Sequence, residues 1–197
     1  MEGENPKMSE KIRSFISVDI TDQVLLDKIV KIQQALLETG ADLKLVEPEN
    51  LHLTLRFLGE IPKPTLELVR EELKSLRFNQ FKLNLQGTGA FPNLRRINVV
   101  WIGIKEGEEN LKEIAKKVES MLKKLGFPPD PKGFSPHLTI ARVRTGKNKD
   151  RLVSFIEKFR DYEVGWMTVD SVRLKKSTLT PKGPIYTTID TVQAAKV

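Results

Sequence analysis

The sequence carries both of its histidines in matching surroundings. His52 lies in the segment Asn50-Leu51-His52-Leu53-Thr54, and His137 lies in the segment Ser135-Pro136-His137-Leu138-Thr139. Each histidine is therefore followed by an apolar residue and then by a threonine. Side chains alternate between the two faces of a β-strand, so each histidine shares a face with its threonine while the apolar neighbours point to the other face. The sequence predicts two strands that each present an imidazole beside a hydroxyl.

Two such strands facing one cleft would place a general acid opposite a general base. The ordinary pKa of histidine is about 6.5, so near neutral pH one ring can be neutral while the other is protonated. The neutral ring can accept a proton from water, and the protonated ring can donate one to a leaving oxygen. The hydroxyls of Thr54 and Thr139 and the guanidinium of Arg142 can donate hydrogen bonds to phosphoryl oxygens. These residues predict metal-independent chemistry at a phosphodiester.

Simpler explanations compete with this interpretation. A single histidine in a strand is usually a structural residue, but the repetition of the whole pattern argues against that for this pair. Zinc and iron sites usually need three or more protein ligands, and the sequence has no HExxH motif or carboxylate placed to complete one. We therefore expect no metal and no cofactor. Threonine is also a favoured strand residue, and again the repetition argues for a role in binding.

Composition restricts the class of protein without identifying its partner. The 197 residues are 39% hydrophobic and 30% charged, typical of one large globular domain or two small lobes with a joint core. We expect no membrane association, because the sequence has no bilayer-spanning apolar run and its first residues do not look like a signal peptide. The absence of cysteine excludes disulfides and cysteine nucleophiles and fits a cytoplasmic protein. The net charge of +7 is compatible with a phosphate-bearing partner and equally with a solvated lysine-rich surface.

The hydrophobic pattern predicts an alternation of strands and helices. Residues 1–11 are polar and are expected to form a flexible tail, before a first strand over Ile12–Asp19. Helices are expected near 22–39, 63–77, 107–126 and 149–160. Besides the two motif strands, further strands are expected near 43–46, 80–90, 95–104, 164–174 and 185–192, with the segment Gly89–Asn93 joining two of them.

The order of these elements around the two motifs is similar. Each motif strand follows a helix and a turn and precedes another helix, which predicts a duplicated unit. We expect an α+β fold in which residues 12–197 form a single bilobal domain, with two helix-backed antiparallel sheets facing each other across a central cleft. The sequence contains no glycine-rich phosphate loop or dinucleotide-binding fingerprint.

These residues together give the chain a resemblance to the two-histidine phosphoesterase superfamily, and within it to the RNA 2′,3′-cyclic phosphodiesterases, also called 2′-5′ RNA ligases. The resemblance covers nearly the whole chain: Arg13–Asp19, the first motif Asn50–Gly59, the segment Gly89–Asn93, and the second motif through Arg142. It implies the bilobal fold and hydrolysis of a 2′,3′-cyclic phosphate at an RNA end to a 2′-phosphomonoester. Reversible joining of tRNA halves through a 2′-5′ bond is implied as a side activity.

The resemblance also implies a role for each motif residue. His52 matches the family's proton donor and His137 its proton acceptor, although the sequence alone would allow the reverse. Thr54 and Thr139 match hydroxyls that contact the phosphate, and Arg142 matches a position that holds the terminal phosphate. The implied partner is RNA with a 2′,3′-cyclic phosphate end, including tRNA, and we expect a monomeric enzyme that needs no metal.

Two more residues are candidates for substrate contacts, and two other functions stay open. Arg56 shares the alternation of His52 and Thr54, so it faces either the cleft or the solvent. Phe91 is expected in a loop, where its ring either stacks on a base or packs against the protein. The other functions are an RNA- or nucleotide-binding module without turnover, and a phosphodiesterase for another small cyclic or 2′-5′ linked nucleotide.

Overall fold

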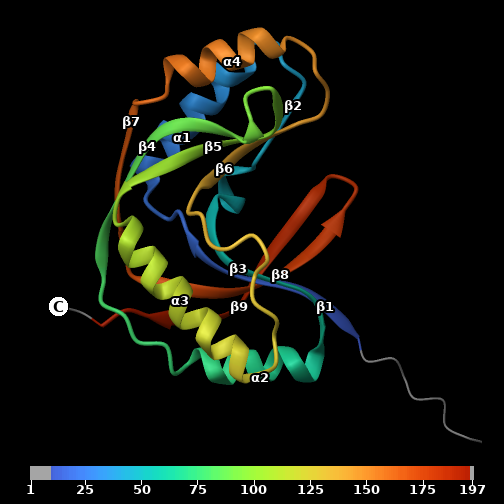
Figure 1. Ribbon diagram of the computed structural model, residues 1–197, viewed down its shortest axis with the longest axis vertical. Helices are drawn as coiled ribbons and strands as arrows, with labels where there is room; N and C mark the ends of the chain where they lie inside the picture. Colours follow the sequence, from blue (N-terminus) through green and yellow to red (C-terminus); the bar gives the residue numbers. More distant parts are fainter. Residues whose placement is uncertain (1–9, 196–197) are drawn as a thin grey trace, which may run out of the picture.

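A computed structural model describes residues 10–195 as a curled antiparallel sheet with two helices packed against each half (Figure 1). In this part of the chain the helices are α1 (Gln23–Leu37), α2 (Lys63–Leu73), α3 (Glu108–Lys124) and α4 (Lys149–Lys158), with a 3-10 turn η1 at Pro48–Asn50. The strands are β1 (Lys11–Asp19), β2 (Leu43–Leu45), β3 (His52–Pro62), β4 (Phe81–Asn93), β5 (Arg96–Glu106), β6 (Leu138–Val143), β7 (Glu163–Val169), β8 (Ser171–Thr180) and β9 (Gly183–Gln193).

The sheet consists of two halves that meet at a narrow seam. Its strand order is β7-β4-β5-β6-β3-β1-β8-β9, with β2 paired to β6. Strands β6 and β3 form the seam, where Leu53 pairs with Leu138. Helices α1 and α4 pack on the half that contains β6, and α2 and α3 pack on the half that contains β3. The bilobal α+β prediction is confirmed, and the two expected sheets are two halves of one sheet.

A single hydrophobic core runs behind both halves. Leu53 and Leu138 at the seam are fully buried and belong to the same cluster as the apolar stripes of the helices. Helix α3 shows the expected 3-4 spacing, because its buried residues are Leu111, Ile114, Ala115, Val118 and Leu122. Because this row of side chains packs against one face of the adjoining strands, the opposite face of those strands is turned away from the helices.

Two expected strands differ from the structure. The strand expected near 164–174 is two strands, because the chain turns at Asp170: β7 pairs with β4 in one half, and β8 pairs with β1 and β9 in the other. The buried apolar positions change phase at the turn, from Met167 and Val169 to Val172 and Leu174, so the pattern carries a signal of the break that the prediction of one strand did not use. The segment Gly89–Asn93 was expected to be a loop but belongs to β4, and the turn follows at Asn93, whose side-chain oxygen accepts from the Arg95 and Arg96 amides.

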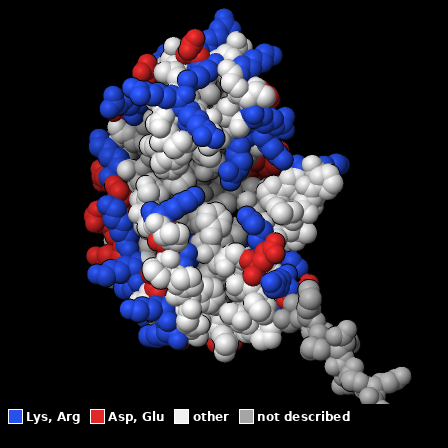
Figure 2. All heavy atoms as spheres, turned by 45° about the vertical axis from the view of Figure 1, so that its right-hand side comes forward, with Lys and Arg blue, Asp and Glu red and all other residues white. Residues whose placement is uncertain are grey.

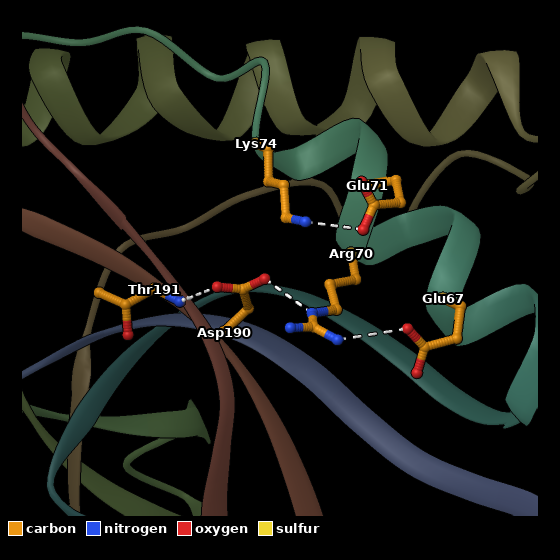
Figure 3. A network of polar contacts seen from close by, with 6 residues as sticks. All are labelled: Glu67, Arg70, Glu71, Lys74, Asp190 and Thr191. Carbon is orange, nitrogen blue, oxygen red and sulfur yellow. Dashed lines mark hydrogen bonds and ion pairs between the residues drawn. The ribbon is translucent and has the colours of Figure 1, made fainter.

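A surface network ties the last strand to helix α2 (Figure 3). The Nε of Arg70 lies 2.8 Å from Oδ2 of Asp190 on β9, and its Nη1 lies 3.5 Å from Oε2 of Glu67. The amide of Thr191 donates to Oδ1 of Asp190 at 2.8 Å. Because these side chains are largely exposed, water screens the ion pairs, and we expect them to add little to stability.

The first described residues already belong to the fold. Strand β1 begins at Lys11, and the carbonyl of Glu10 accepts a hydrogen bond from the amide of Lys63 at 3.2 Å. Residues 1–9 of the expected flexible tail lie outside the described residues. Within residues 10–195, no helix is long and apolar enough to cross a membrane.

Candidate active site

The seam of the sheet brings the two histidine motifs side by side. Leu53 lies between His52 and Thr54, and Leu138 lies between His137 and Thr139. Because the two leucines pair across the seam and are both buried, the flanking side chains of both motifs lie on the face turned away from the core. The two copies of the motif therefore contribute side chains to one site, although they are far apart in the sequence.

The ring of His52 is oriented by its own strand. Its Nδ1 lies 2.7 Å from the carbonyl oxygen of Asn50, which can only accept, so Nδ1 carries the hydrogen and donates it. Its Nε2 lies 3.0 Å from Oγ1 of Thr54. Neutral Nε2 accepts from this hydroxyl, and protonated Nε2 donates to it. Proton exchange by His52 therefore takes place at Nε2.

His137 repeats this arrangement in the second motif. Its Nδ1 donates to the carbonyl oxygen of Ser135 at 2.7 Å, again two residues before the histidine. The neutral ring consequently has its lone pair at Nε2. In the described part of the chain, the hydroxyl of Thr139 makes no side-chain hydrogen bond with the protein. The second motif thus presents a free imidazole nitrogen and a free hydroxyl.

Burial and one arginine shift the titration of both histidines. Burial is the main cause that lowers the pKa of His52, partly offset by its hydrogen bond to Asn50 and by the negative charge of Asp19. Burial also lowers the pKa of His137, and the positive charge of Arg142 lowers it further. The charge of Arg142 acts on both rings, so Arg142 lies within electrostatic reach of both motifs. Among residues 10–195, Arg142 has no acidic partner, so its charge is available to an anion.

Aromatic rings surround each histidine on the same face. The ring of His52 lies 4.9 Å from that of Phe15 and 5.3 Å from that of Tyr186 on β9. The ring of Phe91 lies 4.8 Å from His137 and nearly perpendicular to it. Phe91 thus packs against the second motif from strand β4, instead of lying in a loop as expected. These contacts restrict both imidazoles and exclude water from one side of each.

A cluster of charges lies on the same face beside His52. Asp19 pairs with His52 across β1 and β3, and its Oδ2 binds Nζ of Lys175 at 2.6 Å and Nη1 of Arg173 at 2.7 Å. Burial raises the pKa of Asp19, but the hydrogen bond and charge of Lys175 and the bond to Arg173 outweigh it and lower the pKa overall. Asp19 thus remains charged and offsets one of the two positive charges that bind it beside His52.

A bulge in each motif strand changes the predicted alternation. In β3 the register passes from Thr54 to Arg56 over neighbouring positions of β1, so Leu55 is an extra residue. In β6 the register likewise skips Ile140. The fourth residue after each histidine is therefore buried with the core, and the fifth returns to the site face. These fifth residues are Phe57 and Arg142.

The extra residue in β6 has its own hydrogen-bond partners. The carbonyl of Ile140 accepts from Nε2 of the buried Gln33 at 2.9 Å and from the amide of Val46 at 3.0 Å. The bulge therefore leaves no unsatisfied carbonyl in the core.

Arg56 does not face the site, which corrects its prediction as a substrate contact. It is only 9% exposed and binds Glu119, Asp130 and the carbonyl of Pro128 on the helix side of the sheet. Phe57, which the alternation assigned to the core, is 55% exposed instead, and its ring lies 6.0 Å from that of Phe15. The bulge therefore turns Arg56 to the helix side and Phe57 to the site face, the reverse of what simple alternation predicts.

Sequence reasoning missed six residues of this site: Phe15, Phe57, Tyr186, Asp19, Lys175 and Arg173. Tyr186 lies in a segment predicted only as a strand, and Lys175 lies just beyond the strand expected near 164–174, so nothing local marks either residue. The bulge that exposes Phe57 has no local signal, because simple alternation places Arg56 in phase with His52 and Thr54 and places Phe57 in phase with the buried leucines.

The space around the site favours an anion and offers no metal cage. Lysine and arginine side chains surround a hollow beside the projecting β8–β9 hairpin (Figure 2). Between residues 10 and 195, no group of three or more His, Cys, Asp or Glu side chains is placed to hold a metal ion. The groups at hand are therefore two imidazoles, hydroxyls, the guanidinium of Arg142 and the two cations bound to Asp19.

Comparison with known proteins identifies the family of both halves of the chain. Residues 20–101 and, separately, residues 102–186 match the family described as LigT like Phosphoesterase, so each half of the chain carries one match. A protein of Aeropyrum pernix named RNA 2′,3′-cyclic phosphodiesterase is 41% identical over 171 residues, covering 87% of this chain and 97% of its own. A protein of Archaeoglobus fulgidus with the same name is 43% identical over 175 residues, covering 89% and 96%.

The fold is shared with solved structures. The crystal structure of Escherichia coli LigT in its apo form superposes with a TM-score of 0.76 over 95% of this chain and 99% of its own, at 23% identity. The duplicated match, the identity over nearly full-length relatives and the fold agree with one another. The chain belongs to the LigT-like phosphoesterase family.

Proposed function

We propose that the protein hydrolyses 2′,3′-cyclic phosphodiester ends of RNA to 2′-phosphomonoesters. The observation that carries the proposal is the pair of His-x-Thr motifs at the seam, each with a Nε2 that exchanges protons and a hydroxyl beside it. The relatives that match nearly the full chain bear the name of this activity.

In the proposed reaction the two histidines have opposite roles. Neutral His137 takes a proton at Nε2 from water, whose oxygen attacks the phosphorus. The bond from phosphorus to the 3′ oxygen breaks, and His52 gives its Nε2 proton to that oxygen. The phosphate stays on the 2′ oxygen. Asp19 supports this assignment: burial lowers the pKa of His52 overall, and the charge of Asp19 opposes that lowering, whereas no carboxylate does so for His137.

The remaining groups of the site bind the phosphate. Charge on the non-bridging oxygens grows in the transition state, where preorganised donors stabilise it most. The hydroxyls of Thr54 and Thr139 and the guanidinium of Arg142 are the donors that we assign to these oxygens. Arg142 affects the pKa of both histidines, so it lies within electrostatic reach of the space between them.

We assign Phe57 to the base of the terminal nucleotide. Its ring lies on the site face at the position that corresponds to Arg142 in the other motif, and more than half of it is exposed. An exposed aromatic ring beside a phosphate site can stack on a base of any sequence. Phe91 contacts Trp101 and His137, so we assign it to packing.

The same geometry would accept an RNA 5′-hydroxyl in place of water. Attack by that oxygen would join two RNA ends through a 2′-5′ bond, and the reverse step would cleave it. We include tRNA halves among the substrates for this reaction, with the monomer as the active form and no metal taking part.

The test uses a short RNA that ends in a 2′,3′-cyclic phosphate, incubated with the protein in excess EDTA. The products are separated into 2′- and 3′-phosphates. We expect conversion to the 2′-phosphate, lost in His52→Ala and His137→Ala while the melting temperature is kept. RNA that stays bound and uncleaved by the wild-type protein would contradict the proposal and favour a binding module. Cleavage only of another cyclic or 2′-5′ linked nucleotide would favour the other phosphodiesterase.

A further inference from the structure

We propose that Arg56 is a positioning residue for His137, which it reaches by holding the loop that leads to the second motif. The proposal rests on the proposed function, in which His137 is the general base. Arg56 is part of strand β3 together with His52, yet its contacts lead to the other histidine.

Arg56 joins strand β3 to helix α3 and to the loop behind it. Its Nη2 donates to the carbonyl of Pro128 at 2.5 Å, and its Nη1 lies 3.3 Å from Oδ2 of Asp130. Its Nε lies 2.9 Å from Oε2 of Glu119, at an angle outside hydrogen-bond geometry, so this contact is electrostatic. One guanidinium thus binds three groups that come from two segments.

The two carboxylates also bind the backbone of the loop. Oε1 of Glu119 accepts from the amide of Asp130 at 3.1 Å, and Oδ1 of Asp130 accepts from the amide of Lys132 at 2.9 Å. The carbonyl of Asp130 accepts from Gly133 at 3.1 Å. The cluster of Arg56, Glu119 and Asp130 therefore organises residues 128–133, which form no helix or strand.

This loop contains the group that orients His137. The carbonyl of Ser135, two residues beyond the organised part, accepts from Nδ1 of His137 and determines which nitrogen faces the substrate. The corresponding carbonyl for His52 is that of Asn50, which lies in η1 and is held by a bond from its side chain to Pro184. Loosening the loop should therefore disturb only the second motif.

The duplicated fold does not require an arginine at this position. The equivalent residue after the bulge of the second motif is Ala141, which is fully buried. A buried arginine costs desolvation, and the side chain of Arg56 is only 10% exposed. The loop that Arg56 binds explains why an arginine stands here, where the second motif has Ala141.

The experiment exploits the fact that the chain has two histidines. Each gives one imidazole signal in an NMR spectrum, assigned with His52→Gln and His137→Gln. In Arg56→Met we expect the His137 signal to shift and broaden while the His52 signal, from the same strand as Arg56, stays in place. A displacement of about 1 Å can cost a catalytic group on the order of 100-fold, so we expect kcat to fall roughly 10- to 100-fold with KM nearly unchanged.

Companion variants separate positioning from general stability. Asp130→Asn weakens the same cluster from the exposed loop and should give the same signature, which keeps the test valid if Arg56→Met fails to fold. Arg56→Lys keeps the positive charge but loses the planar guanidinium that binds several groups at once. It should therefore keep part of the kcat that Arg56→Met loses. Arg70→Met, which removes a surface arginine from the network in Figure 3, should change neither signal.

The NMR signals are read without substrate, so they test whether the cluster of Arg56, Glu119 and Asp130 positions His137 even if the wild-type protein hydrolyses no cyclic phosphate. Absence of hydrolysis would contradict the proposed function and leave the cluster with a structural role only. An unchanged His137 signal in both Arg56→Met and Asp130→Asn, or equal changes in both histidines, would overturn the inference directly.

Discussion

Asp19 is the acidic partner of the cations beside His52, and its replacement gives the largest predicted change in the free energy of unfolding. The side chains of Asp19 and Lys175 are 10% and 5% exposed, and their charged atoms lie 2.6 Å apart. In Asp19→Ala the Lys175 ammonium stays buried without its partner, while Arg173 is exposed enough to be hydrated. Breaking a buried pair from one side costs about 3–5 kcal/mol. For a chain of this size, that corresponds to a melting temperature roughly 6–20 °C lower.

A double-mutant cycle measured by urea unfolding at pH 7 tests this reasoning. Lys175→Met should cost less than Asp19→Ala, because Arg173 still pairs with Asp19 at 2.7 Å. The double variant should be more stable than the sum of the single losses predicts, because it leaves no buried charge unpaired. Asp190→Ala, in the exposed network of Figure 3, is the matched control and should change stability by little more than the experimental error.

The pH dependence of the same variant has a definite sign. The pKa of Asp19 in the folded protein is lowered from its ordinary value of 3.8, so the carboxylate stabilises the fold above that pH. The stabilisation is lost as the pH falls through the folded-state pKa, and the difference between wild type and Asp19→Ala should shrink there. An Asp19→Ala loss no larger than that of Asp190→Ala, or constant down to pH 2, would refute the argument.

Three other predictions concern turnover, binding and packing. The pH profile of kcat/KM should be bell-shaped with its centre below pH 6.5, because the pKa values of both histidines are lowered from 6.5. The pH profile of kcat should peak at a higher pH, because the bound anion raises the pKa values of both histidines. Phe57→Ala should weaken RNA binding roughly 5- to 150-fold, from about 1–3 kcal/mol of stacking, without loss of stability. Gly89→Ala should destabilise the fold by about 1–3 kcal/mol, since its methyl group would overlap the Trp101 ring.

Each of these predictions has a result that would contradict it. Stopped-flow turnover across pH 4–9 checks the profile, and a bell centred above pH 7 would contradict the lowered pKa values. Leu68→Ala, a similarly exposed apolar residue on α2, is the control for Phe57, and equal RNA affinity in both variants would contradict stacking. Thermal unfolding checks Gly89→Ala, for which wild-type stability would mean that the Trp101 ring moves freely.

Much of the candidate site could be predicted because its histidines and threonines lie in short local patterns. His52, Thr54, His137 and Thr139 lie within two short segments, and a strand places each pair on one face whatever its partners are. The helices followed from their apolar spacing, and the repeated order of elements indicated the duplication. These features depend on residues near one another in the chain, so the sequence alone carries them.

The rest depends on partners that are distant in the sequence. Whether β3 contains a bulge is decided by its register against β1, and that register exchanges the faces of Arg56 and Phe57. Whether a charge is free or neutralised is decided likewise: Arg56 is bound by Glu119 and Asp130, and Lys175 by Asp19.

The sequence by itself thus determined the helices, most strands, the α+β duplication and the two histidine motifs, because alternation and helical spacing are local consequences of backbone geometry. Only the tertiary structure decided that Phe91 lies in a strand, that the chain crosses between halves at Asp170, and that Arg56 is buried on the helix side of the sheet. Pairing, bulges and charge compensation arise from contacts between segments, and no local pattern specifies the partner that a buried charge will find.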